Sequence, residues 1–233
     1  ERASGYRYSQ RAYLIQIRRE GAGTALVDPI PFGELPDLNT AFGDAEWILH
    51  AASQDLACLR EVGLNPTRLF DTELAARLLG YPRVGLATLV ESILGQSMRK
   101  EHSAVDWSQR PLPTPWLEYA ALDVEVLVEL RDILHEELVT QEKLSWAQEE
   151  FQHLIDHRPV PRVDPWRRTS GIHKVKNRRA LAAVRELWIT RDELAQRGDT
   201  TPGRLIPDSA LVAAAVALPS NRQRLLGVKG FHG

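Results

Sequence analysis

The sequence is poor in three residue types: it has one cysteine, one methionine, and only 7% aromatic residues in a chain of 233. With no second cysteine, Cys58 cannot form an internal disulfide bond, and thiolate zinc sites are excluded as well. No apolar run approaches the roughly 18 residues needed to span a bilayer, and the N-terminus has no basic stretch followed by an apolar signal core. These absences predict a soluble, cytoplasmic protein.

Several chemical signatures are also missing. The sequence has no glycine-rich phosphate loop, which argues against an NTPase or a helicase. His50 and His102 lack partners at zinc-binding spacing, and the run His135-Glu136-Glu137 lacks the second histidine of a zinc helix. The hydrophobic content of 43% and the charged content of 26% are close to globular averages, so disordered and collagen-like chains are excluded.

The net charge of -2 hides an asymmetry along the chain. Residues 1–156 carry 14 Lys and Arg against 25 Asp and Glu, a balance of -11, while residues 157–233 carry 15 against 6, a balance of +9. A basic C-terminal part suggests a polyanionic partner. An acidic N-terminal part suggests either a solvated surface or carboxylates gathered around metal ions.

The patterning predicts two domains joined by a linker. In residues 1–150, short apolar runs at 13–17, 24–27 and 47–49 predict buried strands, and helices are predicted after Ser53, at 74–79 and from 115 to 138. This order indicates an α/β fold with a mixed sheet and flanking helices. Residues 151–172 are predicted to be a linker or docked arm because 157–166 holds three prolines.

Residues 173–233 are predicted to form a small all-helical domain. Leu181, Val184, Leu187, Trp188 and Leu194 fall on one face of a predicted helix, followed by a turn at 201–203 and helices at 209–218 and 222–226. The pattern stops after Phe231 without a closing helix, so we expect the domain to be truncated.

Two acidic positions are candidates for chemistry. Asp55 follows a predicted strand and lies in the first turn of a helix, where it could equally well complement the helix dipole. Tyr119 and Asp123 are four residues apart, so a helix places both on one face, next to Leu122 and Val126, which we expect to face inward. An inward Asp is costly unless it is paired or binds metal, and a simple Tyr–Asp hydrogen bond is the alternative.

Other residues are expected to be structural. Asp71 is interpreted as a helix cap rather than a metal ligand, and Cys58 as a small core residue. The remaining acids of the long helix are expected to be solvated: Glu125, Glu129, Asp132, Glu136 and Glu137.

The ordered set of motifs resembles the ribonuclease D family of 3′-to-5′ exonucleases. That family opens with Asp-x-Glu before a strand; Glu1 with Leu14-Ile15-Gln16 is similar to the second acid and the strand, and the first Asp would lie two residues before Glu1. His50-Ala51 with Asp55-Leu56 is similar to the second motif, and Tyr119 with Asp123 to the third. Further similar stretches lie between them, at 71–72, 85–89 and 106–112. The tail, from Asn177-Arg-Arg to Gly230-Phe231, is similar to the helical HRDC module, an auxiliary nucleic-acid binder.

The resemblance implies a ribonuclease H-like exonuclease domain and a two-metal mechanism. Glu1, Asp55 and Asp123 would hold two divalent cations, Mg²⁺ or Mn²⁺, and Tyr119 would position the attacking water. The substrate would be RNA with a single-stranded 3′ end, such as a tRNA precursor, cut by a monomer into nucleoside 5′-monophosphates. The nucleic-acid contacts expected in the basic tail are Lys174, Lys176, Arg178, Arg179 and Lys229.

Three alternatives stay open at this point. The same acids suit a DNA exonuclease, because ribose discrimination depends on 2′-hydroxyl contacts that the sequence does not locate. A catalytically silent RNA-binding scaffold is favoured if the residue two before Glu1 is not Asp. A protein-interaction module would make the pairing of Tyr119 with Asp123 a coincidence.

Overall fold

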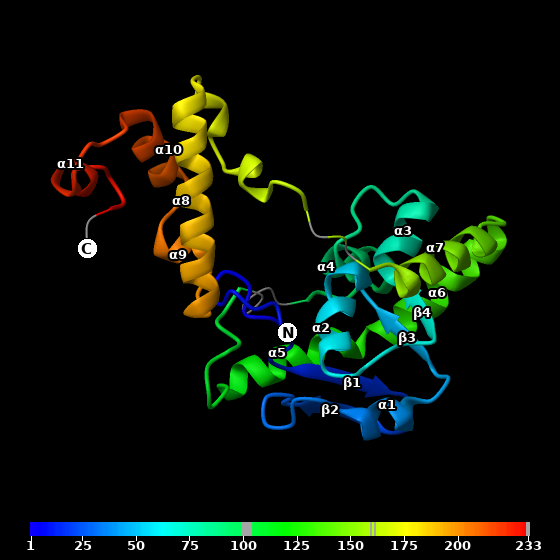
Figure 1. Ribbon diagram of the computed structural model, residues 1–233. Coiled ribbons are helices and arrows are strands. Elements are labelled where there is room, and N and C mark those ends of the chain that lie inside the picture. The colour runs from blue at the N-terminus through cyan, green and yellow to red at the C-terminus, as the bar shows by residue number, and fades with distance from the viewer. Residues whose placement is uncertain (99–103, 159, 161, 232–233) are drawn as a thin grey trace. The chain divides into compact units, whose positions relative to one another are not determined.

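The computed structural model describes residues 1–98, 104–158, 160 and 162–231, and the chain divides into two compact units (Figure 1). The first unit holds Glu1–Ala3 and Arg11–Arg158, and the second holds Ser4–Gln10 and the described part of Pro159–Gly233. Among the described residues, no helix is both long enough and apolar enough to cross a membrane.

The strands of the first unit pair in both directions. β1 (Ile15–Arg19) and β2 (Gly23–Val27) are antiparallel, whereas β3 (Glu46–Leu49) and β4 (Arg68–Asp71) are parallel, with Leu49 opposite Asp71. Within the described ranges these pairs form two separate two-stranded sheets. The sequence pattern misses β4, because only the two central residues of Arg-Leu-Phe-Asp are apolar.

Helices connect and cover the strands of the first unit. They are α1 (Pro36–Phe42), the 3-10 turn η1 (Ala52–Gln54), α2 (Leu56–Glu61), α3 (Thr72–Leu79), α4 (Leu86–Leu89), the π-helical turn η2 (Val90–Leu94), α5 (Thr114–Glu125), α6 (Leu127–Thr140) and α7 (Leu144–Asp156). Helix α7 continues through residue 150, where the sequence places the end of the first domain.

The predicted long helix from 115 to 138 is two helices, α5 and α6, which meet at Val126. Helix α5 buries Ala120, and Leu122 lies two residues further on, about 200° around the helix. Leu122 is therefore 52% exposed, and the expectation that it faces inward is wrong. Glu137 also differs from expectation, because it accepts hydrogen bonds from the Tyr81 hydroxyl at 2.9 and 3.0 Å.

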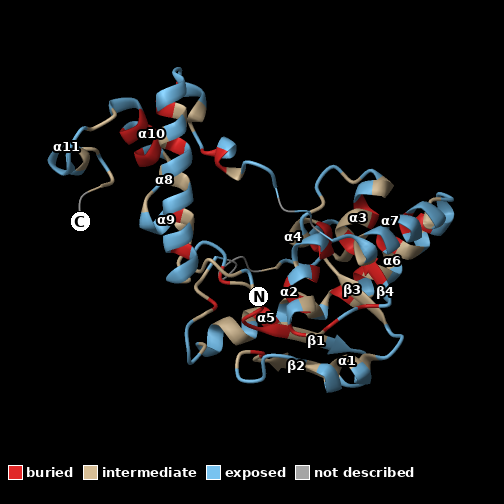
Figure 2. Ribbon diagram, viewed as in Figure 1, coloured by how far each residue is buried: buried red, intermediate tan, exposed pale blue. Residues whose placement is uncertain are grey.

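The main core of the first unit lies where β4 meets α6 and α7. Leu130, Leu134 and Leu138 repeat along α6 and are completely buried. Figure 2 shows buried stretches of α6 in red. Phe70 of β4 contacts Phe151 of α7 with ring centroids 4.9 Å apart. Apolar residues at helical spacing therefore fasten the helices to the strand pair that leads into the candidate site.

The second unit is built around the 20-residue helix α8 (Arg178–Arg197). Its other elements are the 3-10 turns η3 (Pro165–Arg168) and η4 (Ile172–Lys174), and the helices α9 (Pro202–Leu205), α10 (Asp208–Ala217) and α11 (Arg222–Leu226). Val184 of α8 is buried as expected, but Leu194 is 48% exposed. The helical period continues through Arg191 and Ala195 instead, which are the buried residues at that end.

The segment Ser4–Gln10 belongs to this second unit, which the sequence pattern does not predict. The Tyr8 hydroxyl donates to Asp192 Oδ2 at 3.0 Å, and the Ser9 N–H donates to Asp199 Oδ1 at 2.8 Å. The Arg204 guanidinium lies 4.0 Å from the centre of the Tyr6 ring. Contacts between residues almost 200 positions apart thus hold this segment against the helical unit.

Candidate active site

Tyr119 and Asp123 lie one turn apart on α5, as the spacing predicts. A hydrogen bond joins the Tyr119 hydroxyl to the Asp123 carboxyl. Burial and the negative charge of Glu1 raise the pKa of Asp123 to about 6. Burial and the adjacent Asp123 carboxylate also raise the pKa of Tyr119, so its hydroxyl stays protonated at neutral pH.

Glu1 is held beside β1. The backbone N–H of Tyr13 donates to the Glu1 carbonyl at 2.8 Å, and a bridge pairs Arg2 with Ala12. The side chain of Gln16, on β1, donates from Nε2 to Glu1 Oε1 at 3.1 Å. Burial raises the pKa of the Glu1 carboxyl, and the charge of Asp55 raises it further.

Asp55 lies at the start of α2, after the turn that follows β3. We expected Ser53 to cap this helix, but Ser53 is inside the 3-10 turn and Asp55 occupies the cap position without a side-chain capping bond. Its Oδ1 lies 3.6 Å from Arg2 Nε. Burial raises the pKa of Asp55, although the positive charge of Arg2 opposes the shift.

The predicted acids therefore gather electrostatically around Glu1. The charge of Asp55 acts on Glu1, and the charge of Glu1 acts on both Asp123 and Tyr119. These three partly buried carboxylates, in which Glu1 interacts unfavourably with both Asp55 and Asp123, provide hard oxygen donors, which suit Mg²⁺ or Mn²⁺. In the described part of the chain, no three His, Cys, Asp or Glu side chains are close enough together to hold one ion as they stand. The oxygen donors of these carboxylates fit the chemistry of a divalent cation.

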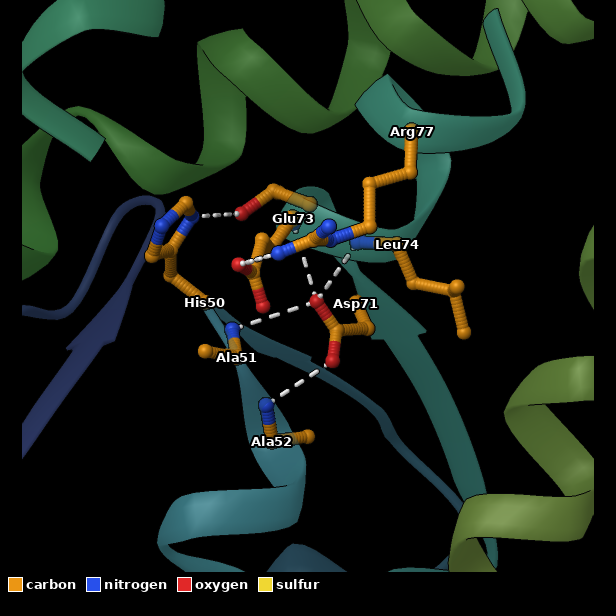
Figure 3. Close-up of polar contacts among 8 residues, drawn as sticks. His50, Ala51, Ala52, Asp71, Glu73, Leu74 and Arg77 are labelled. Atoms are coloured by element: carbon orange, nitrogen blue, oxygen red, sulfur yellow. Dashed lines mark hydrogen bonds and ion pairs between the residues drawn. The ribbon is translucent and has the colours of Figure 1, made fainter. Parts of the chain in front are cut away.

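Three residues around these acids were not singled out from the sequence as site residues. Arg2 and Gln16 contact Asp55 and Glu1, respectively, and carry no signal beyond their position in the first motif. Asp71 caps α3, as predicted, by accepting from the N–H groups of Glu73 and Leu74. It also accepts from two residues of the turn before Asp55 (Figure 3).

The cysteine and the described histidines that we excluded as zinc ligands have other contacts. Cys58 is 4% exposed in the core, as expected. His50 contacts Thr72, with Nδ1 and Oγ1 2.9 Å apart. His135 lies beside the Phe70 ring. His102 lies outside the described residues.

The expected nucleic-acid contacts lie in the second unit. Lys174, Lys176, Arg178 and Arg179 are exposed around the start of α8, whose first turn is capped by Asn177 accepting from the Ala180 N–H at 2.8 Å. None of the ion pairs between described residues involves these four cations. Lys229 is exposed in the segment after α11. Four cations beside the positive end of a 20-residue helix form a favourable surface for phosphate.

Comparison with known proteins gives matches along the whole chain. The 3′-5′ exonuclease family model matches residues 1–139, and the HRDC domain model matches residues 180–233. Ribonuclease D of Gluconacetobacter diazotrophicus is 34% identical over 224 residues, which cover 93% of this chain and 56% of the relative. The chain spans about half the length of the curated relatives it matches.

Two solved structures resemble the chain closely. A protein from Bifidobacterium adolescentis is 46% identical with a TM-score of 0.92, and the match covers 99% of this chain and 57% of that one. Escherichia coli RNase D is 29% identical with a TM-score of 0.74, and the match covers 97% of this chain and 62% of that one. The order of the two domain matches and the ribonuclease D relatives together show that the chain belongs to the ribonuclease D family of 3′-5′ exonucleases, with an HRDC domain after the ribonuclease H-like exonuclease domain.

Proposed function

We propose that the protein is a divalent-metal-dependent 3′-to-5′ exoribonuclease that releases nucleoside 5′-monophosphates from RNA. The observation that carries this proposal is the electrostatic coupling of Glu1 with Asp55 and with the hydrogen-bonded pair Tyr119–Asp123. The repulsion of Glu1 by Asp55 and by Asp123 is costly in a fold, and a bound cation would remove that cost.

The metal-holding residues of this proposal are Glu1, Asp55 and Asp123. The exonuclease family is divalent-metal dependent, and we propose two Mg²⁺ or Mn²⁺ ions for this chain. Such ions stabilise the negative charge that develops on the scissile phosphate. The carboxylates of the chain would orient the ions. When no ion is bound, the positive charge of Arg2, whose Nε lies 3.6 Å from Asp55 Oδ1, partly offsets the negative charge of that carboxylate.

Tyr119 would position the attacking water. Its raised pKa keeps the hydroxyl protonated at neutral pH, so the phenol acts as a hydrogen-bonding group rather than as a base. The bond to Asp123 fixes the hydroxyl on the same face of α5 as the carboxylate. A water molecule that donates to the oxygen of this hydroxyl would be directed toward a phosphate bound at the acids.

The proposed substrate is RNA with a single-stranded 3′ end, including tRNA precursors. The Escherichia coli relative is described as an exoribonuclease involved in structured RNA processing, which supports this class of substrate. We propose that residues 1–150 carry the chemistry and that residues 173–233, joined through 151–172, bind RNA through Lys174, Lys176, Arg178, Arg179 and Lys229. We further propose that the protein acts as a cytoplasmic monomer.

The experiment is degradation of a 5′-labelled RNA oligonucleotide in Mg²⁺ or Mn²⁺. We expect a descending ladder of products, no activity in excess EDTA, and loss of activity in Asp55→Asn. Glu136→Gln is the matched control, because Glu136 is an exposed acid of α6. Internal cleavage, or full activity in EDTA, would contradict the proposal. A matched DNA oligonucleotide degraded faster than the RNA would overturn the choice of RNA.

A further inference from the structure

We propose that Asp71 is a positioning residue that fixes the turn carrying Asp55, an inference that rests on the proposed metal-holding role of Asp55. Asp71 is the last residue of β4 and is only 3% exposed. Its carboxylate accepts four backbone N–H groups, two from the helix that follows it and two from a turn about 20 residues earlier in the chain (Figure 3).

The two carboxylate oxygens of Asp71 have different partners. Oδ1 accepts from Glu73 at 2.9 Å and Leu74 at 3.1 Å, which caps α3, and from Ala51 at 3.1 Å. Oδ2 accepts from Ala52 at 2.8 Å. Capping α3 requires only Oδ1, so the bond that the Ala52 N–H donates to Oδ2 has a separate role in holding the turn after β3.

The turn that Asp71 holds leads directly to Asp55. Ala51 has a φ of 59° and a ψ of 50°, the left-handed conformation that non-glycine residues rarely adopt. Ala52 then begins the 3-10 turn, and its carbonyl accepts from the Asp55 N–H at 3.0 Å. Asp71 Oδ2 holds the N–H of Ala52, and the carbonyl of the same residue holds the backbone of Asp55. Two consecutive hydrogen bonds therefore connect the side chain of Asp71 to Asp55.

A second contact fastens the same strand ends. The parallel pairing of β3 with β4 ends at Leu49 opposite Asp71. One residue further along each strand, His50 Nδ1 and Thr72 Oγ1 are 2.9 Å apart, and the Thr72 hydroxyl donates to the Leu49 carbonyl at 3.3 Å. Side chains thus continue the connection between the strands past the last backbone pair, where the Asp55 turn begins.

The replacement Asp71→Asn separates the capping role from the positioning role. Asn caps helices as well as Asp does, so its oxygen can keep the bonds from Glu73 and Leu74. Its NH₂ group would face the N–H of Ala52, so two donors would oppose each other where the wild type has a hydrogen bond at 2.8 Å. Asp106→Asn is the matched control, because Asp106 accepts both of its Ser108 bonds through Oδ1 alone.

The first measurement is the affinity for Mn²⁺ alone, determined by titration calorimetry. Outer residues that orient metal ligands change metal affinity by about 10- to 100-fold, and we expect a loss of this size in Asp71→Asn, with no change in Asp106→Asn. The thermal midpoint without metal should fall, because two buried donors oppose each other at Ala52, but by less than in Asp71→Ala, which also removes the cap of α3. Wild-type Mn²⁺ affinity in folded Asp71→Asn would overturn the proposal.

The second measurement does not depend on metal and separates this proposal from the proposed function. Cys58 is the one cysteine of the chain, it is 4% exposed, and its thiol donates to the Asp55 carbonyl at 3.1 Å. Its reaction with a thiol reagent therefore reports opening of the turn and α2. We expect about tenfold faster labelling in Asp71→Asn than in wild type, and an unchanged rate contradicts the proposal. If Asp55→Asn binds Mn²⁺ as tightly as wild type does, the metal-holding role of Asp55 in the proposed function is wrong. The comparison of Cys58 labelling between Asp71→Asn and wild type still tests whether Asp71 holds the turn.

A third measurement needs no variant and applies even if Asp71→Asn does not fold. In the wild-type protein the Ala52 N–H should exchange with deuterium slowly, at a rate comparable to core amides, because a buried carboxylate holds it. Exchange as fast as in an open loop would overturn the proposal.

Discussion

Replacing Asp123 with Asn is expected to stabilise the protein in the absence of metal. The carboxylate of Asp123 is partly buried, and its neighbour Glu1 carries the same charge, so ionisation of Asp123 is unfavourable in the folded state. Asn has nearly the same shape and can still accept the hydrogen bond from Tyr119. The replacement therefore removes a repulsion and keeps a contact.

The magnitude follows from the change in pKa. The pKa of Asp123 rises from 3.8 to about 6, which corresponds to about 3 kcal/mol at 1.36 kcal/mol per unit. Because the side chain is only partly buried, solvent screening lowers the expected effect to about 1–2 kcal/mol. For a protein of this size, 1 kcal/mol shifts the thermal midpoint by about 2–4 °C, so we expect the midpoint of Asp123→Asn to rise by about 4 °C at pH 7.5 in EDTA.

The gain depends on pH in a defined direction. The folded pKa of Asp123 is above its unfolded value of 3.8. Wild type therefore keeps its full stability below about pH 4 and loses stability as the pH rises from there through about 6. The stability difference between Asp123→Asn and wild type should therefore be small below about pH 4 and fully developed above about pH 7.

The assay is thermal unfolding followed by circular dichroism, in EDTA and in excess Mn²⁺. In excess Mn²⁺ wild type should have the higher thermal midpoint, because only wild type keeps the full set of carboxylates to bind the ion. Glu136→Gln, an exposed acid of α6, controls for the loss of one negative charge and should change neither midpoint by more than about 1 °C. A lower midpoint for Asp123→Asn in EDTA at pH 7.5 would refute the electrostatic reasoning about the site.

Three further predictions follow from other parts of the chain. Tyr119→Phe should keep Mn²⁺ affinity in calorimetry but slow single-turnover RNA cleavage by about 10²- to 10⁴-fold, and wild-type turnover would exclude the water-positioning role. Replacing Lys174, Lys176, Arg178 and Arg179 with Gln should flatten the salt dependence of log K for single-stranded RNA by about 0.7 per lost phosphate contact, and an unchanged slope would mean that these cations do not contact RNA. In the second unit, Asp208→Ala should lower the free energy of unfolding by about 3 kcal/mol, because it leaves the buried Arg191 charge without its 2.7 Å partner. Arg191→Met should lower the free energy of unfolding by less than Asp208→Ala does. A larger loss for Arg191→Met in denaturant titrations would contradict this account.

The parts of the site that depend on local sequence could be predicted. Tyr119 and Asp123 are four residues apart in a helix, and this spacing is enough to place them together. The cap of α3 by Asp71 is equally local, because both N–H groups come from the next three residues. The apolar runs also located β1, β2 and β3 to within about two residues of their ends.

The parts that depend on long-range contacts could not be predicted. Nothing near Asp71 indicates that it also binds Ala51 and Ala52, because the partners belong to another strand end. The left-handed conformation of Ala51 has no sequence signal either, since glycine or asparagine would be expected there. The placement of Ser4–Gln10 with the helical unit depends on bonds to Asp192 and Asp199, which lie far along the chain.

Asp71 and Asp123 place the same side chain in two different hydrogen-bonding environments. The carboxylate of Asp71 accepts four backbone N–H groups, so its lone pairs are occupied by donors that the fold supplies. Asp123 has the Tyr119 hydroxyl as a donor and Glu1 as a repelling neighbour. Its pKa is raised to about 6 because burial and the charge of Glu1 outweigh the hydrogen bond from Tyr119. A fully satisfied carboxylate gains little from a cation, whereas an under-satisfied one gains the energy that ionisation costs it. This difference in hydrogen bonding, which the sequence does not show, is the physical reason why we propose Asp123 for metal binding and Asp71 for holding the site in place.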